Sequence, residues 1–264
     1  PIVPKEYGGL GLDRFTTALI MEVIAAGHPG LAAVVAATLH AAEPIILAGS
    51  REQKERFLPS LTGRKAGLAS FALTEPGGGS DLTKMETCAI KKDSAFFING
   101  CKDYIINAPV ASFISLIAAT DHSRNKSSIR VFIIPGDLPG LKIGKRHTTS
   151  GLNYAAISEV IFDNTRLDES HVIREDEAGS GYLLLNQTFD RGRAMVAAIS
   201  VGIARRAMEA AVEFAEEREQ FGTRIKHHQA VAFALADMAT DIEMARLLYW
   251  KAGWLIDQGG DYST

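Results

Sequence analysis

The chain has 264 residues, of which 47% are apolar and 22% are charged, and its formal net charge is −3. Because acidic and basic residues are mixed and no basic cluster is present, this composition argues against a protein that binds nucleic acid. The two cysteines, Cys88 and Cys101, are too few for a disulfide framework and favour a reducing compartment, and no spacing of Cys and His predicts a metal site.

The first quarter of the chain has the periodicity of helices. Asp13 is expected to cap the first helix, and Ser50 and Gln53 have the spacing of a capping box that opens the third. The second helix is expected to bend or break at Pro44, because proline lacks the N–H group that the helix ladder uses. We therefore expect helices over residues 13–28, 31–48 and 50–58.

From about residue 68 to 163 the pattern changes to short runs of β-branched and aromatic residues without intervening helices. Such a pattern predicts an antiparallel sheet or barrel and not a Rossmann domain. Asn99-Gly100 favours a tight hairpin turn of type I′, which needs positive φ angles. We expect strands at residues 95–98, 101–106, 112–119, 129–134 and 157–162, after a first strand near residue 68.

The last part of the chain is helical again, with a long helix over 181–219 and a second over 228–257. The fold class is therefore α+β and multidomain: an N-terminal helical domain (1–67), a central antiparallel β-barrel domain (68–177) and an incomplete C-terminal helical bundle (178–264). The missing initiator methionine and the abrupt end suggest part of a longer protein. The longest mostly apolar run, residues 194–204, is shorter than the roughly 18 residues of a membrane span, so no integral membrane segment is expected.

The stretch LTEPGGGSD, Leu73–Asp81, is the first candidate for a ligand site. Its consecutive glycines allow backbone N–H groups to converge on an anion, and Thr74 and Ser80 add hydroxyl groups. On composition alone, a plain surface turn is favoured over an anion site. The spacing of a P-loop or of a GxGxxG motif is absent. Farther along, Asp190 and Arg193 share a helix face and could pair with each other or bind a polar ligand.

Several segments, in order and at fitting intervals, resemble acyl-CoA dehydrogenases: PKEYGGLGL, LAGSREQKERFLPSL, FALTEPGGGSD, EREQFGTRIKHHQA and LADMATDIEMARLLYWKA. The resemblance spans almost the whole chain. It implies FAD as cofactor, removal of the α and β hydrogens of an acyl-CoA thioester, and transfer of electrons to an electron-transferring flavoprotein. The compartment that it implies is a bacterial cytoplasm or the mitochondrial matrix.

The resemblance also implies roles for individual residues. At the FAD of the same subunit it places Phe71, Leu73, Thr74, Gly79, Ser80, Tyr104, Ile105 and Ile106. Residues that reach the FAD of a neighbouring subunit are Arg218, Phe221, His228 and Gln229, so a homodimer or homotetramer is implied. The CoA portion of the substrate is expected at Ser80, Asp190 and Arg193. Ile106 departs from the family pattern, in which Thr or Ser is frequent.

The chemistry needs a carboxylate that takes the α proton. In most of the family this Glu lies far toward the C-terminus, and in a minority it occupies the position of Gly192, which cannot act as a base. The catalytic base is therefore expected beyond residue 264, and Glu75 is expected to be structural. An acyl-CoA oxidase, a flavin monooxygenase of the same fold, or a non-catalytic relative that acts as an interaction module are the alternatives.

Overall fold

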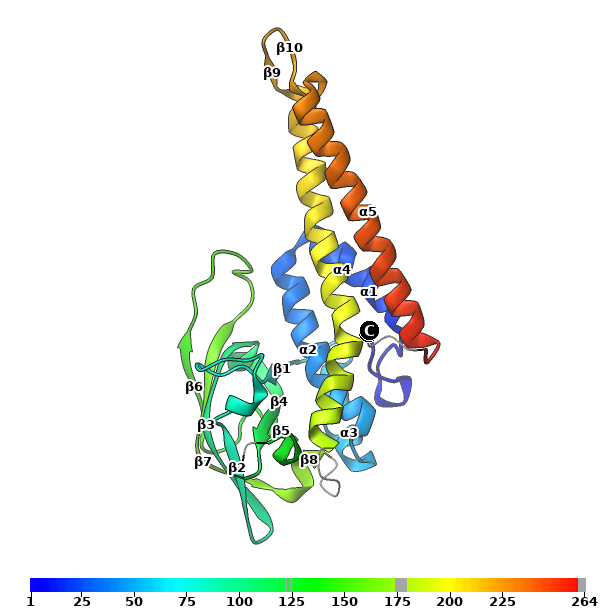
Figure 1. Cartoon of the computed structure of the whole chain (residues 1–264). Helices are drawn as coiled ribbons and strands as arrows, with labels where there is room; N and C mark the ends of the chain where they lie inside the picture. Colours follow the sequence, from blue (N-terminus) through cyan, green and yellow to red (C-terminus); the bar gives the residue numbers. More distant parts are fainter. Residues whose placement is uncertain (122, 124, 174–179, 261–264) are drawn as a thin grey trace. The chain divides into compact units, whose positions relative to one another are not determined.

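The computed structural model of the chain describes residues 1–121, 123, 125–173 and 180–260, and the chain divides into two compact units (Figure 1). The first unit comprises Pro1–Leu12 and Ala33–Phe189. The second comprises Asp13–Ala32 and Asp190–Thr264. The helices are α1 (Arg14–Gly27), α2 (Pro29–Ala48), α3 (Arg51–Phe57), α4 (Ser180–Glu217) and α5 (Gln229–Asp257).

The predicted starts of the N-terminal helices are confirmed. The side chain of Asp13 accepts the N–H of Thr16 at 2.6 Å, which caps α1. Ser50 and Gln53 form the reciprocal capping box of α3. Helix α2 continues through Pro44 without a break, so the predicted break is wrong. The residues around Pro44 are fully buried, and this packing offsets the hydrogen bond that proline cannot make.

The predicted order of helices, sheet and helices is confirmed. The strands of the first unit are β1 (Leu68–Ala72), β2 (Cys88–Lys92), β3 (Ala95–Ile106), β4 (Ala111–Ala119), β5 (Ile129–Pro135), β6 (Leu141–Arg146), β7 (Ile157–Asp168) and β8 (Val172–Ile173). They form one sheet in the order β6-β7-β3-β2-β4-β5-β8, with β1 also paired to β4. Pairing is antiparallel except where β4 meets β1 and β2. Over the described residues the strand order does not close on itself, so a barrel is not confirmed.

The predicted hairpin at Asn99-Gly100 is wrong, because β3 runs through it as one strand. Gly100 has a φ of +146°, and a Cβ added there would lie 2.5 Å from the side-chain oxygen of Thr87. Gly100 thus allows β3 to form a bulge opposite β7 and to approach Thr87 closely, and it does not form a turn. The hairpin turn lies instead between β2 and β3, where Asp93 has a φ of +54°.

Strands β4 and β5 are buried on both faces, so that two hydrophobic clusters lie on opposite sides of the sheet. Ile114, Leu116 and Phe132 belong to one of them, here called the inner cluster. Phe113 and Ile133 alternate with them and pack toward α2 and α3. This period of two explains why the central strands read as continuous apolar runs.

Within the part of the chain that the structure describes, one helix, α2, is long and apolar enough to cross a membrane, with a mean hydropathy of 1.8, although no such segment was expected from the sequence. Within the described residues 56% of its most apolar window is buried inside the protein. Ala41, Ala42 and Ile45 are fully buried and pack on the sheet cluster. These contacts are those of a core helix.

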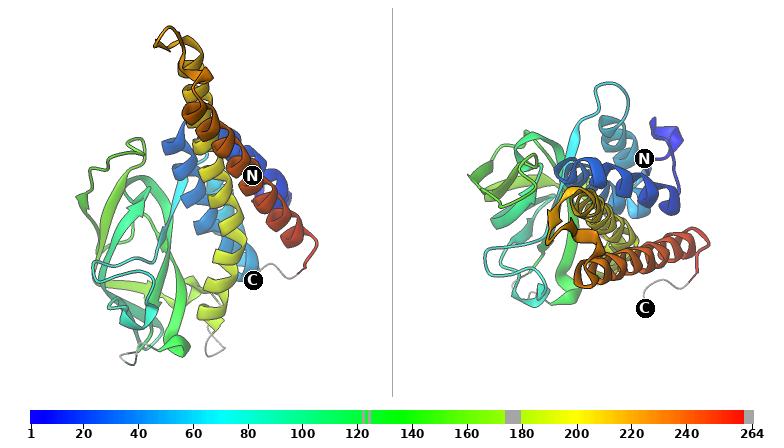
Figure 2. Two further views of the ribbon diagram at one scale, coloured as in Figure 1. Left: turned by 45° about the horizontal axis from the view of Figure 1, so that its top comes forward. Right: turned by 90° about the horizontal axis from the view of Figure 1, so that it is seen from above.

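The second unit is built on α4 and α5, which run side by side and antiparallel and are joined by the hairpin β9 (Glu219–Gln220) and β10 (Thr223–Arg224) (Figures 1 and 2). Helix α1 completes its core, where Ala18 packs with Ala198 and Tyr249. Gly202 permits this close packing, since a Cβ there would lie 2.3 Å from the carbonyl oxygen of Glu22. Glu22 itself is buried and paired with Arg246 at 3.0 Å.

Candidate functional site

The loop Leu73–Asp81 follows β1 and contains a tight turn. The N–H of Glu75 donates to the carbonyl of Gly78 at 2.9 Å, and the N–H of Gly78 donates back to Glu75 at 3.0 Å. Gly78 has a φ of +147°, which side chains disfavour. Gly79 lies against Thr74, because a Cβ added to Gly79 would be 3.1 Å from the Oγ1 of Thr74. The glycines therefore shape the turn and keep its outer surface open.

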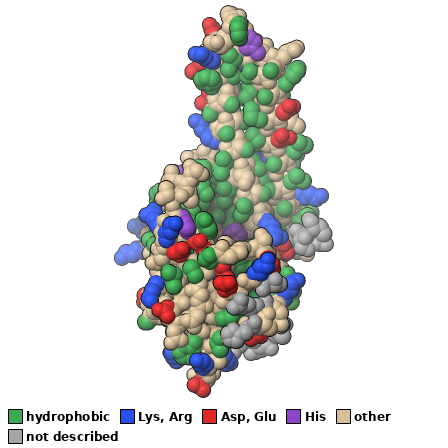
Figure 3. All heavy atoms as spheres, turned by 60° about the vertical axis from the view of Figure 1, so that its left-hand side comes forward, with side chains coloured by type: hydrophobic (Ala, Val, Ile, Leu, Met, Phe, Trp, Pro, Cys, Tyr) green, Lys and Arg blue, Asp and Glu red, His purple; other side chains and the backbone are tan. Residues whose placement is uncertain are grey.

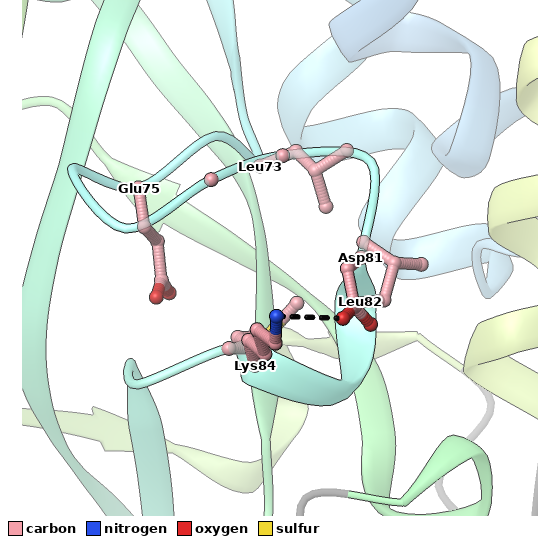
Figure 4. A pocket seen from close by; sticks show the side chains of 8 residues that line it. Leu73, Glu75, Asp81, Leu82 and Lys84 are labelled. Carbon is pink, nitrogen blue, oxygen red and sulfur yellow. Dashed lines mark ion pairs between the residues drawn. The ribbon is translucent and has the colours of Figure 1, made fainter.

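A small hollow lies under this loop (Figure 4). Its empty space is about 230 Å³ and includes open solvent, so the hollow is shallow and encloses no ligand-sized cavity. It is therefore not by itself a pocket for a dinucleotide. Its lining residues are Leu73, Glu75, Gly78, Gly79, Asp81, Leu82, Lys84 and Met85.

A buried ion pair between Lys102 and Glu75 holds the inner side of the loop. The Nζ of Lys102 lies 2.7 Å from Oε1 of Glu75 and donates to the carbonyl of Leu73 at 2.9 Å. Glu75 also accepts the backbone N–H groups of Glu86 at 2.6 Å and Thr87 at 3.0 Å. With these contacts, its carboxylate is fully engaged in the structure and is not free to act as a base.

The ionisation of this pair follows from its surroundings. Burial opposes the charge of Glu75, but Lys102 and the hydrogen-bond donors outweigh it and hold the pKa of Glu75 below its ordinary value. At Lys102 burial dominates over the attraction of Glu75 and lowers the pKa to about 8. Near neutral pH both groups are therefore charged.

A bulge in β3 between Lys102 and Ile105 presents Tyr104 next to the loop. The N–H of Asp103 donates to the carbonyl of Thr74 at 2.8 Å, which joins the strand to the loop. Tyr104 has a φ of +57°, and its side chain is 59% exposed. The structure thus brings together Thr74 and Tyr104, two of the residues that the resemblance implies at the flavin.

Ile105 and Ile106 differ from Tyr104 in their exposure. The side chain of Ile105 is 2% exposed and belongs to the inner cluster of the sheet, so only its backbone is available to a ligand. Ile106 is partly buried, and its carbonyl accepts the hydroxyl of Ser70 at 2.7 Å. Neither side chain offers a hydrogen bond.

Phe71 and Leu73 lie at the other end of the candidate site. Both are partly buried and pack against a cluster that includes Leu185 and Phe189 of α4. The ring of Phe71 is 5.9 Å from that of Phe189 in an edge-to-face arrangement. Ser80 is exposed in the loop. These positions are compatible with apolar contacts for Phe71 and Leu73 and a polar contact for Ser80.

The remaining residues with an implied role at the flavin belong to the second unit and gather at the hairpin between α4 and α5. Phe221 is 97% exposed, and positive φ angles at Phe221 and Gly222 form the tight turn. His228 is the residue before α5, and its ring lies 6.2 Å from that of Phe221. Arg218 and Gln229 flank the hairpin and are exposed. The group therefore projects into solvent.

Asp190 and Arg193 form an ion pair with each other at 2.8 Å. The Arg193 side chain is 71% exposed, so the pair contributes little stability and is open to exchange of partners. Gly192 is buried between them. Among the described residues, no group of three or more His, Cys, Asp and Glu side chains could hold a metal ion.

The sequence did not indicate the partners that hold the loop and Tyr104 in place, namely Lys102, Asp103 and His147. The available signal was in β3, where Lys102 and Asp103 interrupt a run of apolar and aromatic residues. Two adjacent charged residues that are both buried in a strand need specific partners. His147 carried no local signal, because it follows an exposed strand 44 residues from its partner Asp103.

Comparisons with known proteins identify the family of the chain. Residues 1–65, 70–165 and 179–263 match the family models of the acyl-CoA dehydrogenase N-terminal, middle and C-terminal domains. The chain is 37% identical to cyclohex-1-ene-1-carbonyl-CoA dehydrogenase of Syntrophus aciditrophicus over 97% of its own length and 62% of that protein. It is 38% identical to the human mitochondrial short-chain specific acyl-CoA dehydrogenase over 97% of its length and 61% of that protein.

Solved structures give the same result. The butyryl-CoA dehydrogenase of Megasphaera elsdenii is 33% identical, with a TM-score of 0.93 over 99% of this chain and 69% of that one. The prolyl acyl carrier protein oxidase AnaB is 31% identical, with a TM-score of 0.92 over 99% of this chain and 69% of that one. The chain thus spans about two thirds of the length of the relatives that it matches, and it belongs to the acyl-CoA dehydrogenase family of flavoprotein oxidoreductases.

Proposed function

We propose that the protein is an FAD-dependent dehydrogenase that converts an acyl-CoA thioester to the trans-2-enoyl-CoA and passes the electrons to an electron-transferring flavoprotein. The observation that carries the proposal is the joining of the TEPGGGSD loop to the β3 bulge, through the hydrogen bond from Asp103 to Thr74. Support also comes from the family membership and from the acyl-CoA substrates named for the relatives.

The residues of the first unit fit a flavin. Tyr104 offers an exposed aromatic ring, Thr74 a hydroxyl group, and Gly79 an absence of side chain where a Cβ would crowd Thr74. Phe71 and Leu73 supply apolar walls. When bound, FAD would accept the hydride from the substrate Cβ. These residues would orient the cofactor and exclude water from one side of it.

We propose that the flavin site is shared between subunits of a homodimer or homotetramer. Arg218, Phe221, His228 and Gln229 would bind the FAD of a second copy. The support is their position at the hairpin tip, where Phe221 is 97% exposed and adjoins a helical pair that carries further exposed apolar side chains, because grouped exposed apolar surface marks an interaction site. Apolar side chains also lie among charged ones over the helical pair (Figure 3). Those exposed on α4 and α5 are Leu183, Val196, Ile203, Phe214, Phe233, Met238, Met244, Leu247, Leu248 and Trp254.

For the substrate, we propose that Ser80, Asp190 and Arg193 contact the CoA portion. We further propose that the catalytic Glu is not among these 264 residues, since Glu75 is engaged with Lys102 and the position of Gly192 has no side chain. The proposed division into domains is 1–67, 68–177 and 178–264. The compartment that we infer is a bacterial cytoplasm or the mitochondrial matrix, which is supported by the human relative.

The test is anaerobic titration of the flavin-loaded full-length protein with acyl-CoA thioesters of increasing chain length. Bleaching of the flavin absorbance by one of them supports the dehydrogenase. A full-length protein that binds no flavin overturns the proposal. Because AnaB is an oxidase, an oxidase activity is the second candidate. Oxygen consumption with substrate, in the absence of a flavoprotein acceptor, distinguishes it from the first.

A further inference from the structure

We propose that His147, held by Asp103, positions the ring of Tyr104 as a rigid platform for the planar ring system of the flavin. The inference rests on the proposed function and adds to it a positioning residue that is far from the TEPGGGSD loop in sequence. All three residues belong to the first unit.

The first observation is the stacking of the two rings. The centroids of Tyr104 and His147 are 4.3 Å apart, and the ring planes differ by 15°. This near-parallel geometry is the stacked arrangement that aromatic pairs adopt. A tyrosine whose side chain is 59% exposed would otherwise sample several rotamers, and the imidazole restricts it to one.

The second observation is the anchor of the imidazole. Nε2 of His147 lies 2.5 Å from Oδ1 of Asp103, and the same oxygen accepts the N–H of Tyr104 at 2.8 Å. The side chains of His147 and Asp103 are only 13% and 11% exposed. The backbone N–H of His147 donates to the carbonyl of Ile157 at 2.9 Å, which ties the histidine to β7. One carboxylate therefore fixes both the backbone and the stacking partner of Tyr104.

The third observation is the strained backbone of Tyr104. Its φ of +57° is uncommon for an aromatic residue, and such conformations persist only where the surroundings determine them. The hydrogen bond to Asp103 supplies that constraint. The strain directs the ring out of the strand, whereas the next residue, Ile105, is buried in the core.

The geometry leaves one ring face available. His147 covers one face of Tyr104, and the exposure of the ring leaves the other open. The backbone N–H of Asp103 donates to the carbonyl of Thr74, which places Tyr104 one residue from the contact between β3 and the loop proposed for the flavin. A rigid aromatic ring is a suitable surface for a planar heteroaromatic ligand, because few rotamers are lost on binding.

The test is a double-mutant cycle on the full-length protein, with FAD affinity measured by quenching of flavin fluorescence. We expect His147→Ala to weaken FAD binding about threefold to tenfold. In the Tyr104→Ala background, the same change is expected to have no further effect, because the histidine acts through the tyrosine. Tyr154→Ala removes another exposed tyrosine, at 64%, from the segment between β6 and β7 that also contains His147, and is expected to leave the affinity unchanged.

The outcomes separate this inference from the proposed function. A wild-type protein that binds no FAD overturns the proposed function. If the wild type binds FAD, an unchanged affinity in His147→Ala overturns the positioning role, and so does an additive loss in the double variant. Circular dichroism confirms that each variant is folded. Should His147→Ala fail to fold, His147→Gln keeps a donor to Asp103 but removes the ring, and the same weakening is expected.

Discussion

Lys102 and Glu75 form a fully desolvated ion pair, with Nζ and Oε1 2.7 Å apart and side chains that are 0% and 6% exposed. The pair connects β3 to the loop that carries the candidate cofactor residues. Taking both charges out of water is costly, so the pair persists only because backbone groups complete its hydrogen bonds. It defines the shape of the loop more than it adds net stability.

The first prediction concerns removal of one partner. Lys102→Met leaves the Glu75 carboxylate buried without its counter-ion, and we expect a loss of about 3–5 kcal/mol in the free energy of unfolding. Lys102→Met combined with Glu75→Gln should recover part of this loss, because no uncompensated charge remains. The measurement is denaturant unfolding followed by circular dichroism.

Hydrogen exchange locates the effect within the molecule. The amides of Glu86 and Thr87 donate to Glu75 and should lose protection first in Lys102→Met. The matched control is Lys142→Met, which removes the exposed partner of Asp163 in an ion pair of 2.9 Å and should leave the unfolding midpoint unchanged. Equal effects of the two substitutions would contradict the importance of burial.

The second prediction is a loss of stability in acid. The folded-state pKa of Glu75 lies below the ordinary value of 4.5, so its ionised form stabilises the fold above that pH. As the pH falls below 4.5 the unfolded chain takes up the proton first, and the contribution is lost progressively through the lowered pKa. The midpoint of unfolding of the wild type should therefore decrease as the pH is lowered through this range. In Glu75→Gln the part of the pH dependence that comes from this residue should be absent, and identical pH profiles would refute the assignment.

Elements that depend on residues close together in the sequence were predictable, as the Asp13 cap and the Ser50–Gln53 capping box illustrate. Asn99-Gly100 was misjudged because a tight turn and a bulge use the same residues, and the choice was decided by Thr87 on another segment. Strands β2 and β6 were not expected, since CAIKK and LKIGKR are short and carry two charged residues of five and three of six.

The candidate site also has a part that the sequence predicts and a part that it does not. The loop could be identified from its own residues and from the resemblance. Its support could not, because Lys102 lies 27 residues from Glu75 and His147 lies 44 residues from Asp103. These contacts depend on the bulge that turns Lys102 inward and Tyr104 outward. A shift of β3 by one residue would move each of its side chains to the opposite face of the sheet. Sequence periodicity does not determine where a bulge lies.

The third prediction concerns the core of the second unit. Gly202→Ala places a Cβ 2.3 Å from the carbonyl oxygen of Glu22, so α1 must move, and we expect a loss of about 1–3 kcal/mol. Gly27→Ala is the control, since nothing lies within 4 Å of its Cβ position and alanine favours a helix. Tryptophan fluorescence reports on this unit, because Trp250 and Trp254 both belong to it. A Gly202→Ala protein as stable as Gly27→Ala would contradict the close packing of α1 and α4.

The fourth prediction tests the proposed sharing of the flavin site. Phe221→Ser removes a side chain that is 97% exposed and makes few contacts within its own subunit, so the stability of the isolated fold should not change. If Phe221 contacts the FAD of a second copy, the flavin content of the purified full-length protein should fall several-fold. The matched control is Leu10→Ser, which removes an apolar side chain at 63% exposure outside α4 and α5 and should preserve the flavin content.

The subunit origin of the effect can be shown by mixing. The Phe221→Ser protein is mixed with a second single variant, Gly79→Val. The valine should block the FAD site of its own subunit by crowding Thr74. Mixed oligomers of the two single variants contain some sites with an intact loop and an intact Phe221 from the neighbour. Their flavin content should exceed that of either variant alone. Recovery that fails under conditions where the subunits are shown to exchange would place Phe221 outside the flavin site.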